Sequence, residues 1–316
     1  MPIELIFSPE VEQAFQQGKP VVALESTVIS HGLPPVDNIY VATAMEDVVR
    51  EYGAVPATIA ILSGKIHVGL TVAQIEHLGK AKPIRKCSIR DLPIVIAKRG
   101  DGATTVAATS RIAHWAGIKI FATGGIGGVH LNDPFDISAD LDEFGQTPVT
   151  VVCAGAKAIL DLPLTVEKLE TLGVPVIGYQ TDELPAFYYR QSGLPVDERL
   201  DTPLEIAQVM QTHNQLQLKT GILVVNPIPP EYEWLKSEAL EAIGQAVSSA
   251  EAEQISGKAL TPYLLDRVST LSDGQSKRSN IALLLNNAKL ASEVACELYA
   301  NSDNVQTAIP LLTNHN

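Results

Sequence analysis

The sequence predicts an α/β fold with a mostly parallel central sheet flanked by helices and a helix-rich C-terminal part. Short apolar runs, typical of fully buried parallel strands, alternate with segments of helical periodicity as far as Val225. From Glu231 onward all of the chain has helical character. Strands that alternate with helices favour a parallel sheet wrapped in helices.

The expected strands are short and apolar. They are Val21–Leu24, Ala57–Leu62, Pro93–Ala97, Ile118–Ala122, Val149–Cys153, Val174–Tyr179 and Gly221–Val225. The expected helices place apolar residues three or four positions apart. They are Ser8–Gln17, Val41–Tyr52, Val72–Leu78, Thr104–Trp115, Thr165–Leu172 with a capped start at Thr165, Leu204–Leu216 and Ile281–Leu298.

The chain has 316 residues, of which 46% are apolar and 19% charged, as in a compact protein with a buried core. No repeat, low-complexity segment or linker divides it. We therefore expect a single domain over residues 1–302 and a frayed C-terminal tail over residues 303–316.

The charge and the cysteines indicate which partners and which cellular compartment to expect. A net charge of −13 argues against a nucleic-acid partner, and no apolar run is long enough to span a membrane. The first ten residues lack the basic and apolar regions of a secretory signal. Cys87, Cys153 and Cys296 lie far apart in apolar segments, which fits reduced thiols in a cytoplasmic protein.

The stretch from Phe121 to Lys157 is the expected centre of the chemistry. It contains two apolar strands that each end in a turn of small residues, and two carboxylates between them, Asp136 and Asp140. In open α/β sheets ligands bind outside the carboxyl ends of the strands, which is where such turns lie.

Lys157 is the candidate nucleophile because it follows a buried strand through Ala154, Gly155 and Ala156. Close to the interior an amine loses stabilisation of its charge, and the neutral form attacks carbonyl groups. The alternative is a lysine that only extends from a helix N-terminus to solvent.

Glu25 is the candidate proton donor or acceptor, because partial burial at the end of the strand Val21–Leu24 favours its acid form. A helix cap or a salt-bridged carboxylate is the alternative. Asp136 and Asp140 would share one helix face if residues 137–144 are helical, and would then suit a divalent metal or sugar hydroxyls. Helix N-terminal acids are their alternative role.

The glycine turn Gly124–Gly128 is a weak candidate for binding phosphate through main-chain N–H groups, and Lys86 could add a positive charge. The turn matches neither the dinucleotide-binding fingerprint nor a P-loop, so ATP and NAD are not indicated. The seven histidines form no zinc-protease motif, although His31 and His130 lie in glycine-bearing turns of the expected site.

Taken together, these segments resemble the pseudouridine-5′-phosphate glycosidase family, also called the indigoidine synthase A-like family. The resemblance spans nearly the whole chain, and several motifs are long enough to be very specific. The motifs are LESTVISHGLP (Leu24–Pro34), RDLP (Arg90–Pro93), GATTVA (Gly102–Ala107), FATGGIGGVH (Phe121–His130), FDISADL (Phe135–Leu141), VTVVCAGAK (Val149–Lys157), GVPVIGYQT (Gly173–Thr181), LPAF (Leu184–Phe187), NPIP (Asn226–Pro229) and SNIALLLNNA (Ser279–Ala288). The loop His130–Pro134 is shorter than in the family.

The resemblance implies reversible cleavage of the C–C glycosidic bond of pseudouridine 5′-phosphate to uracil and ribose 5-phosphate, supported by a divalent metal, typically Mn²⁺, in a homotrimer. It makes Lys157 the Schiff-base lysine, Glu25 the proton donor and Asp136 the metal ligand. The positions it assigns to substrate contacts are Lys86, Val106, His130, Ser138, Ala139, Asp140 and Asn280.

Two other functions remain open on the residues alone. A Schiff-base aldolase or lyase on another phosphosugar would share Lys157, and a non-catalytic binder of sugar phosphates would share the phosphate-binding groups. The presence of both Lys157 and Glu25 argues against the binder, since binding alone needs no covalent nucleophile.

Overall fold

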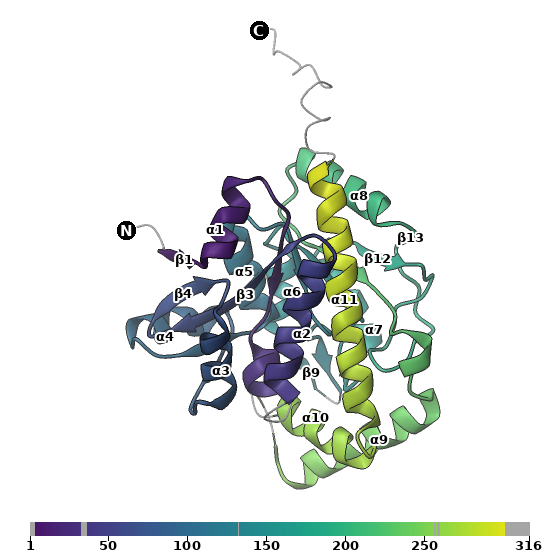
Figure 1. The fold of residues 1–316 in the computed structure, drawn as a ribbon. Coiled ribbons are helices and arrows are strands. Elements are labelled where there is room, and N and C mark those ends of the chain that lie inside the picture. Colours follow the sequence, from purple (N-terminus) through teal and green to yellow (C-terminus); the bar gives the residue numbers. More distant parts are fainter. Residues whose placement is uncertain (1–3, 33–36, 132, 256, 258–259, 301–316) are drawn as a thin grey trace, which may run out of the picture.

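The structure is a computed structural model that describes residues 4–32, 37–131, 133–255, 257 and 260–300. The tail expected to fray, residues 303–316, lies outside the described residues. Figure 1 shows the strands at the centre and helices on both sides of them.

A mostly parallel sheet forms the centre of the molecule, as the sequence predicts. Within the described residues it has eleven strands, nine of them in the order β1-β4-β3-β2-β7-β10-β14-β12-β13, with β6 pairing with β3 and β5 with β6. The strands are β1 (Leu5–Phe7), β2 (Val21–Leu24), β3 (Val55–Leu62), β4 (Lys65–Val68), β5 (Arg85–Cys87), β6 (Gly102–Thr104), β7 (Ile120–Ala122), β10 (Thr150–Cys153), β12 (Val176–Tyr179), β13 (Glu198–Leu200) and β14 (Ile222–Val225). Among the described strand pairs of this central sheet, only β3–β4 and β3–β6 are antiparallel.

Helices cover both faces of this sheet. On one face α11 packs against α2, α8 and strands β2, β7 and β10, and it runs the length of the molecule in yellow in Figure 1. On the other face α5 packs against α6 and strands β2, β3 and β7. The helices are α1 (Pro9–Gln16), α2 (Asp37–Glu51), α3 (Val72–Lys80), α4 (Leu92–Ala97), α5 (Val106–Ala116), α6 (Ala139–Phe144), α7 (Leu162–Thr171), α8 (Pro203–Gln215), α9 (Lys236–Ala252), α10 (Leu260–Leu271) and α11 (Gln275–Ala300), with short π or 3₁₀ turns at Val28–Gly32, Ile89–Asp91 and Pro230–Tyr232.

The central strands are almost entirely apolar because both faces of the sheet are covered, and Thr150 at the start of β10 is their one polar residue. Every residue of β2, β7, β10 and β14 is buried. Their register pairs Leu24 with Ala122, Ala122 with Val152, and Cys153 with Val225. These four parallel strands therefore end at nearly the same level, and the residues that follow them lie at one edge of the sheet.

A small antiparallel sheet joins β7 to α6. Its strands are β8 (Val129–His130), β9 (Asp133–Ile137) and β11 (Leu160–Asp161), in the order β11-β8-β9. It extends from the carboxyl edge of the central sheet, and it carries His130 and Asp136.

Two local predictions are wrong. Pro93–Ala97 belongs to helix α4, not to a strand. A short apolar run does not by itself distinguish a strand from a buried helix, and Pro93 is compatible with the first turn of a helix. Helix α7 begins at Leu162, where the carboxylate of Asp161 accepts from the main-chain N–H of Leu164 at 3.0 Å, so the cap is Asp161 and not Thr165.

The cysteines are free, as expected: Cys87 and Cys153 are buried and Cys296 is half-buried. Burial raises the pKa of the Cys153 thiol to about 12, which leaves it protonated and inert at neutral pH. No described helix combines the length and the apolar character needed to cross a bilayer.

Candidate active site

A cavity of about 340 Å³ opens at the carboxyl edge of the central sheet. Its volume is within the range of small-molecule sites. All ten site residues predicted from the sequence line this one cavity: Glu25, Lys86, Val106, His130, Asp136, Ser138, Ala139, Asp140, Lys157 and Asn280. The structure thus brings together residues separated by up to 255 positions, while their individual roles stay predictions.

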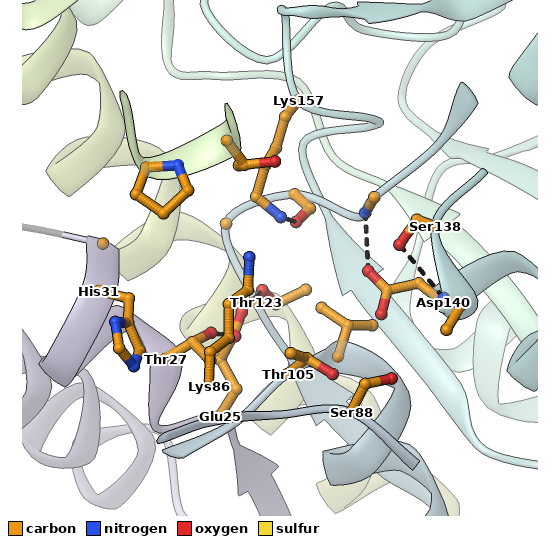
Figure 2. A pocket seen from close by; sticks show the side chains of 18 of the residues that line it. Glu25, Thr27, His31, Lys86, Ser88, Thr105, Thr123, Ser138, Asp140 and Lys157 are labelled. Atoms are coloured by element: carbon orange, nitrogen blue, oxygen red, sulfur yellow. Dashed lines mark hydrogen bonds between the residues drawn. The ribbon is translucent and has the colours of Figure 1, made fainter. Parts of the chain in front are cut away.

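Glu25 follows β2 and is 8% exposed. Its two carboxylate oxygens accept hydrogen bonds from the hydroxyls of Thr27 and Thr123. Thr27 lies two residues further along the chain, whereas Thr123 is the first residue after β7, so the adjacent strand end contributes to holding the carboxylate. Figure 2 shows Glu25 between these two threonines at the cavity wall.

Lys157 is held by the turn that follows β10. Its main-chain N–H donates to the carbonyl of Ile126 at 3.0 Å, and its Nζ donates to the carbonyl of Gly125 at 2.7 Å. Gly155 permits this turn: its φ is +85°, and a side chain there would lie 2.1 Å from the carbonyl oxygen of Pro185. In Figure 2 Lys157 enters the cavity from the side opposite Glu25.

The glycine turn supports the site from inside the fold. The N–H of Gly127 donates to the carboxylate of Asp140 at 2.9 Å. A side chain at Gly127 would lie 2.1 Å from the hydroxyl of Ser138, so glycine is needed for this close approach. The N–H of Gly127 is thus committed to a carboxylate and not presented to a phosphate.

Asp136 and Asp140 do not share a helix face, contrary to the expectation for a helix over residues 137–144. Asp136 lies on β9, and Asp140 is in the first turn of α6, after the N-cap Ser138. The second oxygen of Asp140 accepts from the N–H of Ala107 at 2.9 Å, so this carboxylate joins α6, α5 and the glycine turn. Among the described residues no hydrogen bond or ion pair engages the carboxylate of Asp136.

His130 lies on β8 and lines the cavity on the side of Asp136. Burial lowers the pKa of its imidazole and outweighs the attraction of Asp136, which acts in the opposite direction. The imidazole is therefore neutral at pH 7, so one of its nitrogens can donate a hydrogen bond to a polar ligand and the other can accept one.

The polar residues of the cavity wall that the sequence reasoning did not name as site residues include Thr123, Ser88 and Arg90, while His31 was placed only in a turn near the expected site. Within the described part of the chain, Nε2 of His31 and Oγ of Ser88 are buried without a hydrogen-bond partner. Burial, and then the charges of Lys86 and Lys82, lower the pKa of His31. Buried polar atoms without partners are costly, and those in a cavity wall are what a polar ligand would satisfy. The motifs around His31, Ser88 and Arg90 were noticed, but no spacing rule separates such residues from surface polar residues.

Asn280 and Val106 complete the wall. Asn280 comes from α11, and its Oδ1 is 3.4 Å from where a side chain at Gly124 would begin. Val106 is the first residue of α5, after the N-cap Thr105. Two helices on opposite faces of the sheet therefore close the cavity over the strand ends.

A lysine amine and a carboxylate line one cavity at the edge of the sheet, with hydroxyls and a second lysine around them, which is an arrangement typical of α/β enzymes that act on polar small molecules. The comparison with known families agrees with this class. The chain belongs to the indigoidine synthase A-like family: the family model described as "Indigoidine synthase A like protein" matches residues 10–297.

Similar proteins cover nearly the whole chain. The pseudouridine-5′-phosphate glycosidase of Geobacillus kaustophilus is 55% identical over 93% of this chain and 98% of its own. That of Caldanaerobacter subterraneus subsp. tengcongensis is 54% identical over 92% of this chain and 95% of its own. A solved structure of the prealnumycin C-glycosynthase AlnA in complex with ribulose 5-phosphate superposes with a TM-score of 0.88 at 41% identity, covering 96% of this chain and 99% of AlnA.

Proposed function

We propose that this chain is a pseudouridine-5′-phosphate glycosidase, which uses one water to cleave the C–C bond between ribose and uracil and yields uracil and ribose 5-phosphate. The observation that carries the proposal is that Lys157 and Glu25 line one cavity. They do so in a chain more than half identical to proteins of that name.

The leaving atom in this reaction is a ring carbon of uracil, which leaves only after protonation. In the proposed first step the amine of Lys157 bonds to C1′, the bond from C1′ to the ring oxygen breaks, and the proton lost by the amine goes to that oxygen. Glu25 then gives a proton to the uracil carbon attached to C1′.

The C–C bond breaks next, and its electron pair goes to the protonated uracil. The lone pair on the nitrogen of Lys157 forms the C=N bond of an iminium at C1′, so lysine serves as the electron source. Water adds to the iminium, Glu25 recovers its proton from that water, and the amine is released with ribose 5-phosphate. Protons and electrons balance over this cycle.

The phosphate of the substrate belongs, in this proposal, on the side of the cavity where Ser88, Thr105 and Ser138 lie in Figure 2. The unpartnered hydroxyl of Ser88 supports this position. Lys86 and Arg90 line the same cavity and supply positive charge for a phosphate dianion. The other proposed substrate contacts, Val106, His130, Ala139, Asp140 and Asn280, complete the lining.

A divalent cation such as Mn²⁺ is proposed to bind at Asp136. The described residues contain no group of three His, Cys, Asp or Glu side chains arranged as a metal cage. A hard cation bound by one free carboxylate, with waters as its other ligands, is compatible with such a site. When bound, the ion would neutralise charge on the phosphosugar. Electron paramagnetic resonance of Mn²⁺ should show binding to the wild type and weaker binding to Asp136→Asn.

A homotrimer in the cytoplasm is proposed as the working form. Phe135 on β9 supports an assembly, because this aromatic residue is 92% exposed beside the cavity residue Asp136. Burial of such a ring against a second copy would remove apolar surface from water. Light scattering after size-exclusion chromatography tests the state, and a monomer at working concentrations would contradict it.

Uracil release tests the function directly. Pseudouridine 5′-phosphate, uridine 5′-phosphate and unphosphorylated pseudouridine are incubated with the protein, with and without Mn²⁺, and free uracil is measured. We expect release from pseudouridine 5′-phosphate alone. Binding without product over long incubation would favour a sugar-phosphate binder. Turnover of another phosphosugar through Lys157, without uracil release, would favour an aldolase or lyase.

A further inference from the structure

Two asparagines that the proposed mechanism does not use meet inside the protein. Asn226 directly follows β14 in the NPIP motif, and Asn287 lies on α11 in the SNIALLLNNA motif. They are 5% and 0% exposed. The side-chain nitrogen of Asn226 donates to the side-chain oxygen of Asn287 at 3.1 Å. Neither residue lines the cavity, so neither is placed to touch a ligand.

Asn287 binds the loop that follows β7. Its Nδ2 donates to the carbonyl of Thr123 at 2.8 Å and approaches that of Gly124 at 3.4 Å. Carbonyl oxygens only accept hydrogen bonds, so the nitrogen of the Asn287 amide faces the loop and its oxygen faces Asn226. Aspartate would set a negative oxygen against two carbonyls, and leucine would remove the hydrogen bond to the carbonyl of Thr123, although the carbonyl of Gly124 would still accept from the main-chain N–H of Ala154 at 2.9 Å. The position therefore requires an amide.

The loop bound by Asn287 contacts both proposed catalytic groups. The hydroxyl of Thr123 donates to Glu25, and the carbonyl of Gly125, two residues on, accepts from Nζ of Lys157 at 2.7 Å. Residues 123–125 therefore form one short support for the proton donor and the nucleophile. The amide of Asn287 joins this support to α11 by hydrogen bonds.

Asn226 fixes the orientation of that amide. Its main-chain N–H donates to the carbonyl of Cys153 at 2.8 Å, which anchors it to the end of β10. Its side chain also donates to the carbonyl of Asn286 at 3.3 Å, while Nδ2 of Asn286 donates to Pro227 at 3.2 Å. Hydrogen bonds thus run from the end of β14 to the middle of α11 and from α11 back to the segment after β14.

We propose that Asn287, oriented by Asn226, is a positioning residue that fixes the loop 123–125 and so sets Glu25 and Lys157 relative to each other. This rests on the proposed function of Glu25 and Lys157. Displacement of catalytic groups by about 1 Å can cost about 100-fold in rate. Asn287→Ala should therefore lower kcat by about 10- to 100-fold and change KM by less than about 3-fold.

The test counts working sites before it compares rates. Each variant is treated with ribose 5-phosphate and borohydride, and the sugar trapped at Lys157 gives the number of competent lysines. Uracil release per trappable lysine is then measured. A positioning role predicts that this ratio falls in Asn287→Ala. A role in folding alone predicts fewer trappable sites with normal turnover at each, which would overturn the proposal.

Ser292→Ala is the matched control, because Ser292 is a fully buried polar residue of α11 and, among the described residues, its hydroxyl donates to the carbonyl of Ala288 in the same helix at 2.8 Å and to no other group. Its turnover per site should equal that of the wild type. If Asn287→Ala does not fold, Asn226→Ala is measured in its place. That variant keeps the hydrogen bond from Asn287 to the loop but removes the partner that orients the Asn287 amide, so turnover per site should fall by a smaller factor than in Asn287→Ala. Unchanged turnover in Asn226→Ala would then contradict the proposal.

A double variant tests whether the tie acts through the loop. Thr123→Val and Asn287→Ala disturb the same support, so their combined loss should be smaller than the product of the two separate losses. Losses that multiply would overturn the coupling. Wild-type protein that releases no uracil would instead contradict the proposed function, so the two failures are distinguishable.

Discussion

The side-chain amine of Lys157 donates a hydrogen bond to the carbonyl oxygen of Gly125, with 2.7 Å between Nζ and O. Two residues earlier, the hydroxyl of Thr123 donates to the carboxylate of Glu25. The two groups proposed to do the chemistry thus contact one tripeptide, although 132 positions separate them in the sequence (157 − 25). The loop at the end of β7 is therefore a shared contact of both groups.

Lys157→Ala should abolish turnover. Loss of the amine removes covalent catalysis, and comparable nucleophile substitutions cost three orders of magnitude or more, so we expect a fall of about 10³-fold or greater in kcat. Borohydride added with ribose 5-phosphate should attach the reduced sugar phosphate to the wild type at Lys157, as read by peptide mass. Lys80→Ala, which alters an exposed lysine paired with Glu76, should behave as the wild type. Normal turnover in Lys157→Ala would contradict the mechanism.

Ser88→Ala should weaken binding of phosphorylated ligands. A hydrogen bond to a charged group contributes about 1.5–3 kcal/mol, so KM for pseudouridine 5′-phosphate should rise by about 10- to 100-fold. The fold should not change, because the main-chain N–H of Ser88 keeps its bond to Asp91 at 3.1 Å.

Ser110→Ala is the control for that substitution. The hydroxyl of Ser110 is also buried without a partner among the described residues, but Ser110 lies in α5 and does not line the cavity. Its KM should be that of the wild type. If both substitutions raise KM equally, or if Ser88→Ala leaves KM unchanged, the phosphate does not bind at Ser88.

The strand ends could be predicted because buried parallel strands have a strong local signal. Val21–Leu24 is apolar at every position and Val149–Cys153 at every position but Thr150, and Glu25 and Lys157, which follow these strands, stand out by charge. The lining positions came from matching motifs. For these residues the local sequence pattern and the family resemblance were sufficient to predict which side chains line the cavity.

The support beneath that wall could not be predicted. Thr123 and Asn287 act through contacts between segments 164 residues apart, and no local pattern records such a pair. Asp140 was expected to share a helix face with Asp136, but the strand β9 ends between them, so Asp136 lies on the strand and Asp140 in the first turn of α6. The short run Pro93–Ala97 was ambiguous because its length suits either a strand or a short helix.

Asp140→Asn should destabilise the protein. The buried carboxylate accepts from the N–H groups of Ala107 and Gly127, both at 2.9 Å, and an amide can accept only one of these bonds well. We expect a loss of about 2 kcal/mol in the free energy of unfolding, measured by urea denaturation. Asp142→Asn, an exposed substitution on the same helix, should change stability by less than about 1 kcal/mol. An unchanged midpoint for Asp140→Asn would mean that this carboxylate does not brace the site.

His213 should contribute to the acid sensitivity of the fold. It is buried in α8, its ring contacts the hydroxyl of Thr220 at 3.1 Å, and burial lowers its pKa below the ordinary value of 6.5. The unfolded chain takes up a proton near pH 6.5 while the folded ring stays neutral, so the stability from this group is complete above that pH. It is lost as the pH falls through the folded-state pKa.

His213→Gln should therefore flatten the decline of stability between pH 7 and pH 5, by at most about 1.4 kcal/mol per pH unit. Urea titrations at several pH values measure that slope. The slope is compared, and not the stability at one pH, because loss of the contact with Thr220 lowers stability equally at every pH. Thr212→Ala is the control, because it removes an exposed hydroxyl bound to Gln208 in the same helix at 2.9 Å and leaves the imidazole in place. If His213→Gln keeps the wild-type slope, the acid sensitivity arises at other groups, and the burial of His213 has no linkage to folding in this range.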